Sequence, residues 1–328
     1  MAATSLAMTT PTTAFVWGFR ARGYFRPFDT HAELARTDDG GRTWHVMPGA
    51  PRENYQSEAV SDVTFVSPTI GYLWGRRVYR TVDGGLTWRP LRVPSHRVDE
   101  LSGSDGYAWA LAPACSGPSC LKETVFRIDP DGRIERRDIP PTRVDADDRL
   151  GGTYDGLQTL FTGEKDRRVE LWLQGPSGGW VGRRTPCDFA ALDAIGADNE
   201  VHLLCTGEPG AGEQLTQAWV SGDGGRTWSH RSSPGEFGYP TGLDVAAGTW
   251  ILSRERGSIQ TSNDGRRWRP ARFRAPKGYT GGEGFDQIDI LADGVGAALP
   301  ADAFQGDTRL AYTTDYGREW TTRKVRIG

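Results

Sequence analysis

The stretch Thr81-Val82-Asp83-Gly84-Gly85-Leu86-Thr87-Trp88 decides the fold, because the chain repeats its pattern, Ser/Thr-x-Asp-x-Gly-x-x-Trp. A short carboxylate such as that of Asp83 can accept hydrogen bonds from the N–H groups of a tight turn. Gly85 tolerates a positive φ, which a side chain would resist. Trp88 opens the returning strand and offers a large apolar surface to the core. We therefore interpret the stretch as a structural turn between two antiparallel strands.

The pattern occurs five times, beginning at residues 37, 81, 221, 261 and 313. Each copy supplies one turn residue and one tryptophan: Asp39 and Trp44, Asp83 and Trp88, Asp223 and Trp228, Asn263 and Trp268, and Asp315 and Trp320. Asn263 stands where the other copies have Asp. The starts are 44, 140, 40 and 52 residues apart, and the gap of 140 holds three units of about 47. Two weaker copies inside it, at 127–134 and 174–180, make seven units.

A period of about 40 to 50 residues with short strands and glycine-rich turns is typical of a β-propeller with four strands per blade. We expect an all-β fold, a single seven-bladed β-propeller with four antiparallel strands per blade and the repeated turn between the third and fourth strands. The expected domain is one, residues 1–328, with blades at approximately 4–50, 57–94, 98–140, 155–186, 187–234, 239–274 and 284–326. First and last blades would meet by packing, without a shared strand.

These repeats resemble the Asp-box, or bacterial neuraminidase repeat, of a superfamily that includes sialidases, some glycoside hydrolases, sortilin-type receptors and the photosystem II assembly factor. The resemblance covers nearly the whole chain. It implies a propeller whose ligands bind on the face opposite the Asp-box turns, here termed the loop face. It does not identify the ligand, because function lies in sites and not in the fold.

A sialidase would bring an arginine triad, a Tyr/Glu nucleophile pair, an aspartic acid-base and an Arg-Ile-Pro signature. The nearest match, Phe25-Arg26-Pro27, lacks the Ile. A broader glycosidase needs two carboxylates across a pocket, and sequence spacing cannot pair the candidates Glu53, Glu58, Asp99, Glu100, Asp155, Asp188, Glu283 and Asp286. The leading hypothesis is a non-catalytic, extracytoplasmic module that binds a protein or a glycan. The alternative is a carbohydrate-active hydrolase or lyase, a sialidase-like glycosidase with its site in the central depression.

The first blade carries an insertion after Trp17 that places three arginines beside two aromatic residues on the loop face. Guanidinium groups can grip a carboxylate bidentately, and the aromatic rings can stack on a planar group. Alternatively, this loop only covers the neighbouring blade, with its arginines paired to acids such as Glu53. The candidate ligand-binding residues are Arg20, Arg22, Tyr24, Arg26, Glu53, Tyr55, Arg76, Glu100, Tyr279 and Glu283.

The composition excludes several classes of partner. Lys and Arg number 39 against 42 Asp and Glu, a net charge of −3, which does not suit a nucleic-acid-binding protein. No run approaches the roughly 18 to 20 apolar residues that span a bilayer. The five histidines do not cluster, and the cysteines lack the paired spacing of a zinc site. We expect no cofactor, no metal, no nucleic acid, no membrane span and a monomer.

The four cysteines form two plausible pairs. Cys115 and Cys120 could close a short loop. Cys187 and Cys205 lie symmetrically about Gly196, so an antiparallel hairpin would bring them face to face. Two disulfides are typical of an oxidising compartment. We therefore expect an extracellular or cell-envelope protein whose signal segment is absent from this chain; the alternative is a cytoplasmic protein with buried thiols.

Overall fold

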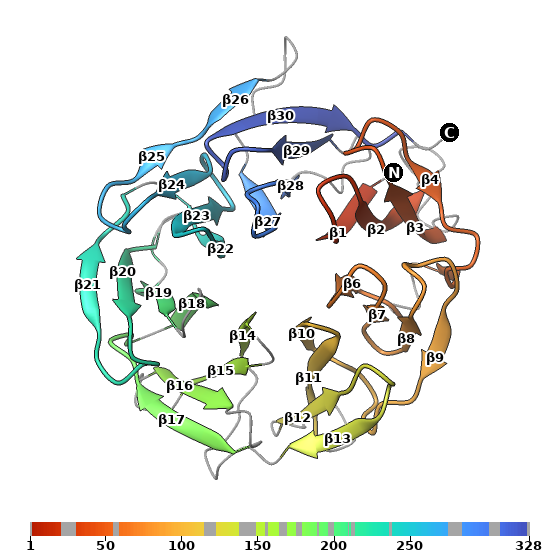
Figure 1. The fold of residues 1–328 in the computed structure, drawn as a ribbon, viewed down its shortest axis with the longest axis horizontal. Helices are drawn as coiled ribbons and strands as arrows, with labels where there is room; N and C mark the ends of the chain where they lie inside the picture. The colour runs from red at the N-terminus through yellow and green to blue at the C-terminus, as the bar shows by residue number, and fades with distance from the viewer. Residues whose placement is uncertain are drawn as a thin grey trace. The chain divides into compact units, whose positions relative to one another are not determined.

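The computed structural model describes residues 2–20, 31–54, 59–114, 123–137, 149–154, 157–163, 169–174, 179–188, 190–195, 200–208, 210, 214–235, 238–274, 284–301 and 309–326. The regular structure of these residues consists of β-strands (Figure 1). The fold is an all-β propeller, as the repeats predict. The chain divides into two compact units, the first made of Met1–Pro90 with Glu236–Gly328 and the second of Leu91–Gly235.

Four sheets, numbered in chain order, belong to the first unit. Sheet 1 contains β1 (Ala2–Met8), β2 (Ala14–Arg20), β3 (His31–Thr37), β4 (His45–Val46) and β5 (Glu53–Asn54). Sheet 2 contains β6 (Asp62–Phe65), β7 (Gly71–Trp74), β8 (Val78–Thr81) and β9 (Arg89–Leu91). Sheet 6 contains β22 (Pro240–Ala246), β23 (Thr249–Arg254), β24 (Gln260–Ser262) and β25 (Arg269–Pro270). Sheet 7 contains β26 (Arg272–Arg274), β27 (Phe285–Ile290), β28 (Gly296–Pro300), β29 (Arg309–Thr313) and β30 (Glu319–Lys324).

Three sheets belong to the second unit. Sheet 3 contains β10 (Glu100–Ser104), β11 (Tyr107–Pro113), β12 (Glu123–Ile128) and β13 (Ile134–Arg137). Sheet 4 contains β14 (Arg149–Tyr154), β15 (Leu157–Gly163), β16 (Val169–Gln174) and β17 (Trp180–Arg184). Sheet 5 contains β18 (Ala190–Ile195), β19 (Val201–Thr206), β20 (Thr216–Ser221) and β21 (Ser229–Ser232). The repeat spacing started the fourth blade at residue 155 and so did not include β14.

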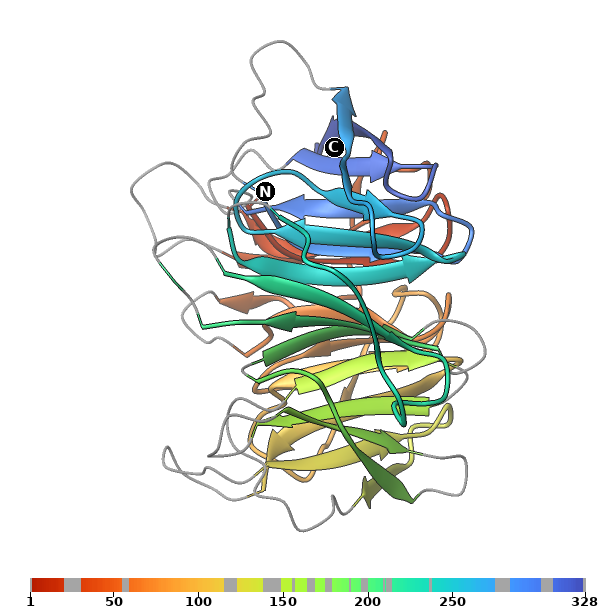
Figure 2. The same ribbon diagram turned by 90° about the vertical axis from the view of Figure 1, so that its left-hand side faces the viewer.

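Two sheets hold a fifth strand, so the prediction of four strands per blade is confirmed only in part. In sheet 1, β5 pairs with β3. In sheet 7, β26 pairs in parallel with β30, beside which it lies in Figures 1 and 2. Ala271 donates its N–H to the Ile259 carbonyl of sheet 6, whereas Arg272 donates to the Arg318 carbonyl of sheet 7. The chain therefore crosses between the sheets at this point, although the repeat spacing assigned it to the sixth blade as far as residue 274.

The core lies between the faces of neighbouring sheets. The second strands carry much of it: β19 and β28 are buried along their whole length. Leu6 and Trp44 of the first sheet pack with Leu310 and Tyr312 of the seventh. A buried tryptophan removes roughly 150 to 250 Å² from water. Packing between neighbouring sheets therefore contributes to the stability of each unit.

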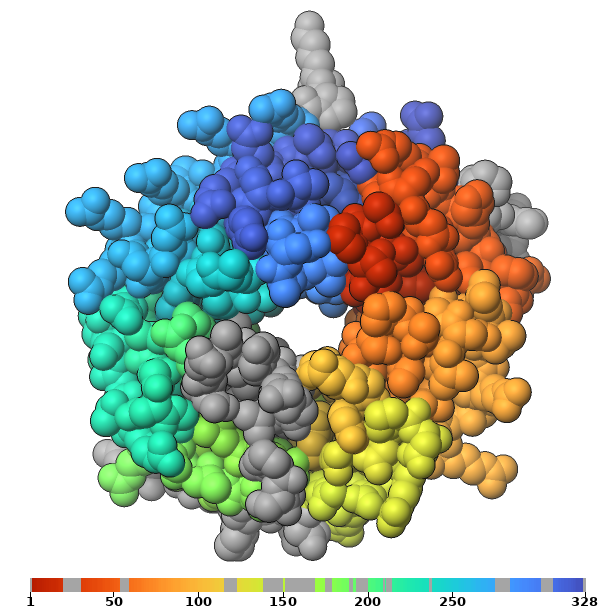
Figure 3. Space-filling model, in the orientation of Figure 1, coloured from red at the N-terminus to blue at the C-terminus, as the bar shows by residue number. Residues whose placement is uncertain are grey.

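Polar side chains link the first strands of neighbouring sheets. Leu6 donates its N–H to Oε1 of Gln287 at 2.8 Å, and Met8 donates to Oδ2 of Asp289 at 2.7 Å. The contact joins sheets 1 and 7, whose red and blue atoms touch in Figure 3. Similarly, Ile290 donates to Asp244 at 2.9 Å. A first strand has one free edge whose N–H groups need acceptors. As expected, the first and last sheets meet through side chains, without a shared strand.

Candidate functional site

The repeated turns are fixed by the side chains that the sequence pattern specifies. Oδ1 of Asp83 accepts hydrogen bonds from the Thr87 N–H at 2.9 Å and from the Thr81 hydroxyl at 2.7 Å. The Thr81 oxygen accepts the Gly85 N–H at 2.9 Å. Gly85 has a φ of 85°, and a Cβ there would lie 2.8 Å from the Phe15 ring. The hydrogen bonds predicted for Asp83 are therefore present, and the glycine is required both by conformation and by space.

The same bonds recur at Asp39, Asp223 and Asp315. Hydrogen bonds to an ionised carboxylate stabilise its charged form. The backbone N–H of Thr227, followed by its hydroxyl, lowers the pKa of Asp223 to about 2. The oxygens of these carboxylates are consequently occupied by their own turns. We refer to the five turns, 37–44, 81–88, 221–228, 261–268 and 313–320, as the aspartate turns.

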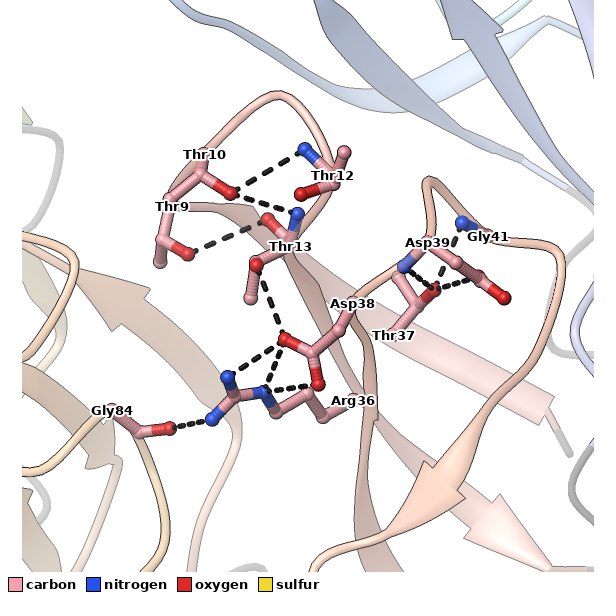
Figure 4. A network of polar contacts seen from close by, with 10 residues as sticks. All are labelled: Thr9, Thr10, Thr12, Thr13, Arg36, Thr37, Asp38, Asp39, Gly41 and Gly84. Atoms are coloured by element: carbon pink, nitrogen blue, oxygen red, sulfur yellow. Dashed lines mark hydrogen bonds and ion pairs between the residues drawn. The ribbon is translucent and has the colours of Figure 1, made fainter.

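Neighbouring aspartate turns are tied to each other. Arg36 forms an ion pair with Asp38 at 2.7 Å and donates from Nη1 to the Gly84 carbonyl of the next turn at 2.7 Å (Figure 4). The tryptophans contribute unequally. Trp44 and Trp320 are buried, whereas Trp88, Trp228 and Trp268 are half-buried. Turn and tryptophan together form a frame at one end of the five sheets that carry an aspartate turn, and we call this the frame.

The aspartate turn of sheet 6, residues 261–268, uses a different residue from the one that the sequence pattern indicates. Oδ1 of Asp264, not Asn263, accepts the N–H groups of Arg266 at 2.8 Å and Arg267 at 3.2 Å. The Ser262 hydroxyl donates to the same oxygen at 3.3 Å. Asn263 instead accepts Nη2 of Arg318 at 3.1 Å. The prediction of Asn263 as the turn residue is therefore wrong, because the Ser-x-Asp pair at 262 and 264 replaces Thr-x-Asn.

A cavity of about 470 Å³ lies where the turns of sheets 6 and 7 meet the crossing strand β26. The residues that line it are Thr261, Ser262, Asn263, Asp264, Arg267, Arg269, Pro270, Arg272, Asp315, Arg318 and Glu319. We name it the turn cavity. Four of these side chains are arginines and three are carboxylates, so the site combines a concave surface with guanidinium groups and acids side by side.

Two of the cavity's arginines hold the wall in place. Nη2 of Arg318 bridges Asn263 and the Thr249 hydroxyl, the latter at 3.3 Å, and its guanidinium lies over the Tyr316 ring. Arg272 is 3.9 Å from Glu319, whose other oxygen pairs with Arg274 at 2.7 Å. The Arg318 contacts join sheet 7 to sheet 6, whereas the contacts of Glu319 join β26 to β30 within sheet 7. They leave Arg318 committed to the frame and Arg272 only loosely paired.

The remaining two arginines are available to a ligand. Arg267 and Arg269 are exposed, and within the described part of the chain neither guanidinium has a hydrogen bond or an ion pair. The cavity's aspartates do not compete for them strongly, because Asp264 and Asp315 each accept turn N–H groups. The arrangement can therefore bind an anionic group without first breaking an internal ion pair.

The turn cavity was not predicted from the sequence, because the family resemblance implies a ligand site on the loop face. A signal was nevertheless present: residues 266–274 hold five arginines. Two of them, Arg266 and Arg267, belong to the repeated stretch 261–268, which the sequence pattern indicates to be a structural turn. The crossing of the chain at Ala271, which brings them against sheet 7, depends on contacts that local sequence does not encode.

The described loop-face candidates are mostly engaged in the fold. Glu53 is buried and accepts the Tyr79 hydroxyl at 3.1 Å and Nη1 of Arg77 at 3.4 Å. Glu100 accepts the Leu150 N–H and so serves the link between first strands. Arg76 is exposed after β7, and Arg20 ends β2. Outside the described residues lie Arg22, Tyr24, Arg26, Tyr55, Tyr279 and Glu283, together with Cys115 and Cys120.

The disulfide between Cys187 and Cys205 is present, with Cα atoms 4.9 Å apart. The reason given from sequence is wrong, because Cys205 pairs across the hairpin with Ala191. Cys187 precedes β18 and is held by its own contacts: its N–H donates to the Thr185 hydroxyl and its carbonyl accepts the Val169 N–H. The bridge thus links a segment before the hairpin to its second strand.

Two neighbouring carboxyl groups, those of Asp244 and Asp289, are among the groups whose pKa values are raised. Burial, and then the nearby Asp289 charge, raises the pKa of Asp244 to about 7, and burial raises that of Asp289 to about 6. Perturbed carboxyl pairs occur at catalytic sites. Here, however, both Asp244 oxygens and Oδ2 of Asp289 accept backbone N–H groups. Their geometry fits a structural link between strands.

The described residues hold no cluster of three or more His, Cys, Asp or Glu side chains that could bind a metal ion. Within the same residues, no helix has the length and apolarity needed to cross a membrane. No protein-family model and no curated protein sequence matches the chain.

The chain is similar to solved structures of YCF48. It superposes on "YCF48 bound to D1 peptide" with a TM-score of 0.60 and 16% identity, covering 92% of each chain. It superposes on YCF48 from Cyanidioschyzon merolae with a TM-score of 0.59 and 14% identity, covering 92% of this chain and 93% of the other. The chain shares the YCF48 fold. At these identities the likeness shows the fold alone, so the function must be argued from the site.

Proposed function

We propose that this protein is a non-catalytic, extracytoplasmic β-propeller that binds a segment of a protein partner. The observation that carries the proposal is the turn cavity, an arginine-lined hollow of about 470 Å³ on a rigid frame. Ligand pockets in proteins typically measure about 300 to 1,000 Å³. The similar fold of YCF48, whose structure holds a D1 peptide, gives independent support for peptide binding.

The carboxylates of the turn cavity favour binding over catalysis. A glycosidase needs one carboxyl group to donate a proton and a second to act as nucleophile or base. Asp264 and Asp315 are each occupied by N–H groups of their turns, and Glu319 pairs with Arg274. Carboxylates that already accept turn N–H groups or pair with an arginine are not placed to attack or protonate a substrate. The cavity is therefore suited to holding a ligand rather than to cleaving one.

The proposal includes the finer features that the repeats predict. The sheets form one seven-bladed ring within a single domain, 1–328, and the repeats are Asp-boxes of the sialidase-like superfamily. The support is the repeat period of the sequence and the contact of sheet 1 with sheet 7. A crystal structure with any other number of blades would remove this part. We keep a glycan as the alternative ligand.

The proposal places the protein outside the cytoplasm. The Cys187–Cys205 disulfide supports this location, because disulfides persist in oxidising compartments. Alkylation of thiols in the producing cell, followed by peptide mapping, tests it. Protected Cys187 and Cys205 are expected; alkylated cysteines in the folded protein would favour the cytoplasm.

The loop face remains a second candidate contact surface. Arg20, Arg22 and Arg26 beside Tyr24 stay in the proposal on sequence grounds. Each arginine is replaced singly by Ala, and binding is measured against acidic glycans and peptides. Lost binding at an unchanged melting temperature supports the loop; unchanged binding leaves it as packing.

A carbohydrate-active hydrolase or lyase is the second candidate, and the raised pKa values of Asp244 and Asp289 are the observation that favours it. One experiment separates the two. The protein is used to select from a displayed library of random peptides and is assayed in parallel on chromogenic sialosides and hexosides. We expect enriched peptides that bind with a measurable Kd and no hydrolysis. Hydrolysis that Asp244→Asn abolishes, or selection of no peptide at all, would overturn the proposal.

A further inference from the structure

We propose that the turn cavity recognises an acidic, extended peptide segment, whose carboxylates pair with Arg267 and Arg269. The inference deepens the proposed function, on which it rests, by naming the site and the chemistry of the ligand. It also places the binding site on the side of the aspartate turns, opposite the loop face that the resemblance implies.

The four arginines of the turn cavity differ in whether they have partners within the protein. Arg318 is held by Asn263 and Thr249, and Arg272 lies near Glu319. Arg267 and Arg269 line the same cavity, and neither guanidinium has a partner within the described residues. Each guanidinium can grip one carboxylate bidentately. Two separate carboxylates on one chain therefore match the two available groups.

The backbone of Arg267 and Arg269 is held by hydrogen bonds of the turn and of β25. Arg267 donates its backbone N–H to Asp264, so its Cα is fixed by the turn. Trp268 lies between the two arginines in sequence, and its Nε1 donates to the Gly265 carbonyl at 3.1 Å. Arg269 starts β25, paired with β24. Binding to groups on an ordered backbone requires less ordering on association. The two side chains are thus presented at a defined spacing.

The acids that line the turn cavity restrict the kind of anion that can bind there. The cavity also contains Asp264, Asp315 and Glu319. Those carboxylates would repel the continuous negative charge of a nucleic-acid backbone, and the chain as a whole has a net charge of −3. A peptide with acidic residues separated by uncharged ones can approach the arginines while avoiding the acids. The volume of about 470 Å³ exceeds what a single carboxylate fills.

The test uses fluorescence anisotropy of a fluorescein-labelled decapeptide of alternating Asp and Gly, with an Asn-Gly decapeptide as the uncharged probe. The key variant is Arg267→Gln with Arg269→Gln. The matched control is Arg89→Gln with Arg92→Gln, which removes two exposed arginines from the corresponding region of sheet 2. Arg89 follows Trp88 as Arg269 follows Trp268, so the local context is the same.

The wild type and the Arg89/Arg92 variant should bind the Asp-Gly peptide alike, with affinity that falls as salt rises. The Arg267/Arg269 variant should lose about tenfold or more in affinity, as expected for two charge-assisted pairs, at an unchanged melting temperature. Equal binding by the Arg267/Arg269 variant, equal binding of the Asn-Gly peptide, or stronger binding of single-stranded DNA would overturn the inference.

Failure here is distinguishable from failure of the proposed function. If library-selected peptides bind the wild type and the Arg267/Arg269 variant equally, the turn cavity is not the site, while peptide binding itself stands. If the library yields no binder, the proposed function fails first. If selected peptides are acidic and need both arginines, the two proposals hold together.

Discussion

The backbone N–H of Met8 donates a hydrogen bond of 2.7 Å to Oδ2 of Asp289, so a side chain of β27 satisfies the free edge of β1. The bond joins the sheet that contains the N-terminus to the sheet that contains the C-terminus. Asp289 in turn lies close enough to Asp244 for its charge to raise that residue's pKa. Although each aspartate retains some accessible surface, the protein atoms packed around both carboxyl groups disfavour their charged forms.

Stability should depend on pH through these two carboxyl groups. Their pKa values, about 7 for Asp244 and about 6 for Asp289, lie above the unfolded value near 3.8. Their stabilising contribution is therefore complete below about pH 4 and lost as pH rises through about 6 to 7. Urea unfolding should therefore give a free energy of unfolding that falls between about pH 4 and about pH 7. For Asp289→Asn the fall should be smaller by about 3 kcal/mol, since its pKa rises from 3.8 to about 6 on folding and a rise of one pKa unit is worth about 1.4 kcal/mol.

The control for this experiment is Asp131→Asn, whose exposed carboxylate lies in the turn of sheet 3. Its pH profile should match that of the wild type. Burial also raises the pKa of Asp62, on β6, so some pH dependence should survive in the Asp289 variant. A variant profile identical to that of the wild type would show that the Asp289–Met8 link is not sensitive to protonation.

Asp83→Ala should destabilise the protein by about 1 to 3 kcal/mol, because the substitution removes acceptors from the Thr87 N–H, the Thr87 hydroxyl and the Thr81 hydroxyl. Asp131→Ala is the matched control. Within the described residues its carboxylate accepts one hydrogen bond, from the Arg133 N–H at 3.2 Å, so this substitution should cost under about 0.5 kcal/mol. Denaturant unfolding measures both. Comparable losses would mean that the aspartate turns are not the main local stabilisers.

The aspartate turn of sheet 6 allows the neighbouring residues Asn263 and Asp264 to be compared directly. Asp264→Ala should lower the melting temperature more than Asn263→Ala, because Asp264 accepts two turn N–H groups whereas Asn263 accepts one arginine. Thermal unfolding of the two variants checks the order. Should Asn263→Ala be the more damaging, the original interpretation of the sequence pattern would be the better one.

The parts of the fold that could be predicted from sequence are those that local hydrogen bonds determine. A carboxylate at Asp83 and a glycine at Gly85 act within one turn, so their roles follow from residue type and spacing. The repeat of that turn then predicts the sheets. The prediction for the aspartate turn of sheet 6 is wrong because two overlapping Ser/Thr-x-Asx pairs are possible there. Aligning the pattern on Trp268 selects the pair that the structure does not use.

The parts that could not be predicted depend on contacts between distant segments. Nothing near Ala271 indicates that the next residue pairs with β30. The turn cavity exists only because of that crossing, so its arginines could be counted in the sequence but not placed together. Likewise, Glu100 and Glu53 are candidate ligand-binding residues in the sequence. In the structure they accept hydrogen bonds from Leu150 and Tyr79, which lie on other strands.

The Cys187–Cys205 disulfide should stabilise the folded protein. Both cysteines are buried in one cluster with Leu171 and Leu203, and the bridge closes a loop of 18 residues. A loop of this size should give about 3 kcal/mol of stability, mainly by restricting the unfolded chain. Replacing both cysteines with Ala should therefore lower the free energy of unfolding by about 2 to 4 kcal/mol. Dithiothreitol should destabilise the wild type but affect the double variant less, since only Cys115 and Cys120 remain in it. If reduction destabilised both proteins equally, the stabilising bridge would have to be the other pair; if it affected neither, no disulfide would be contributing to the stability of the folded protein.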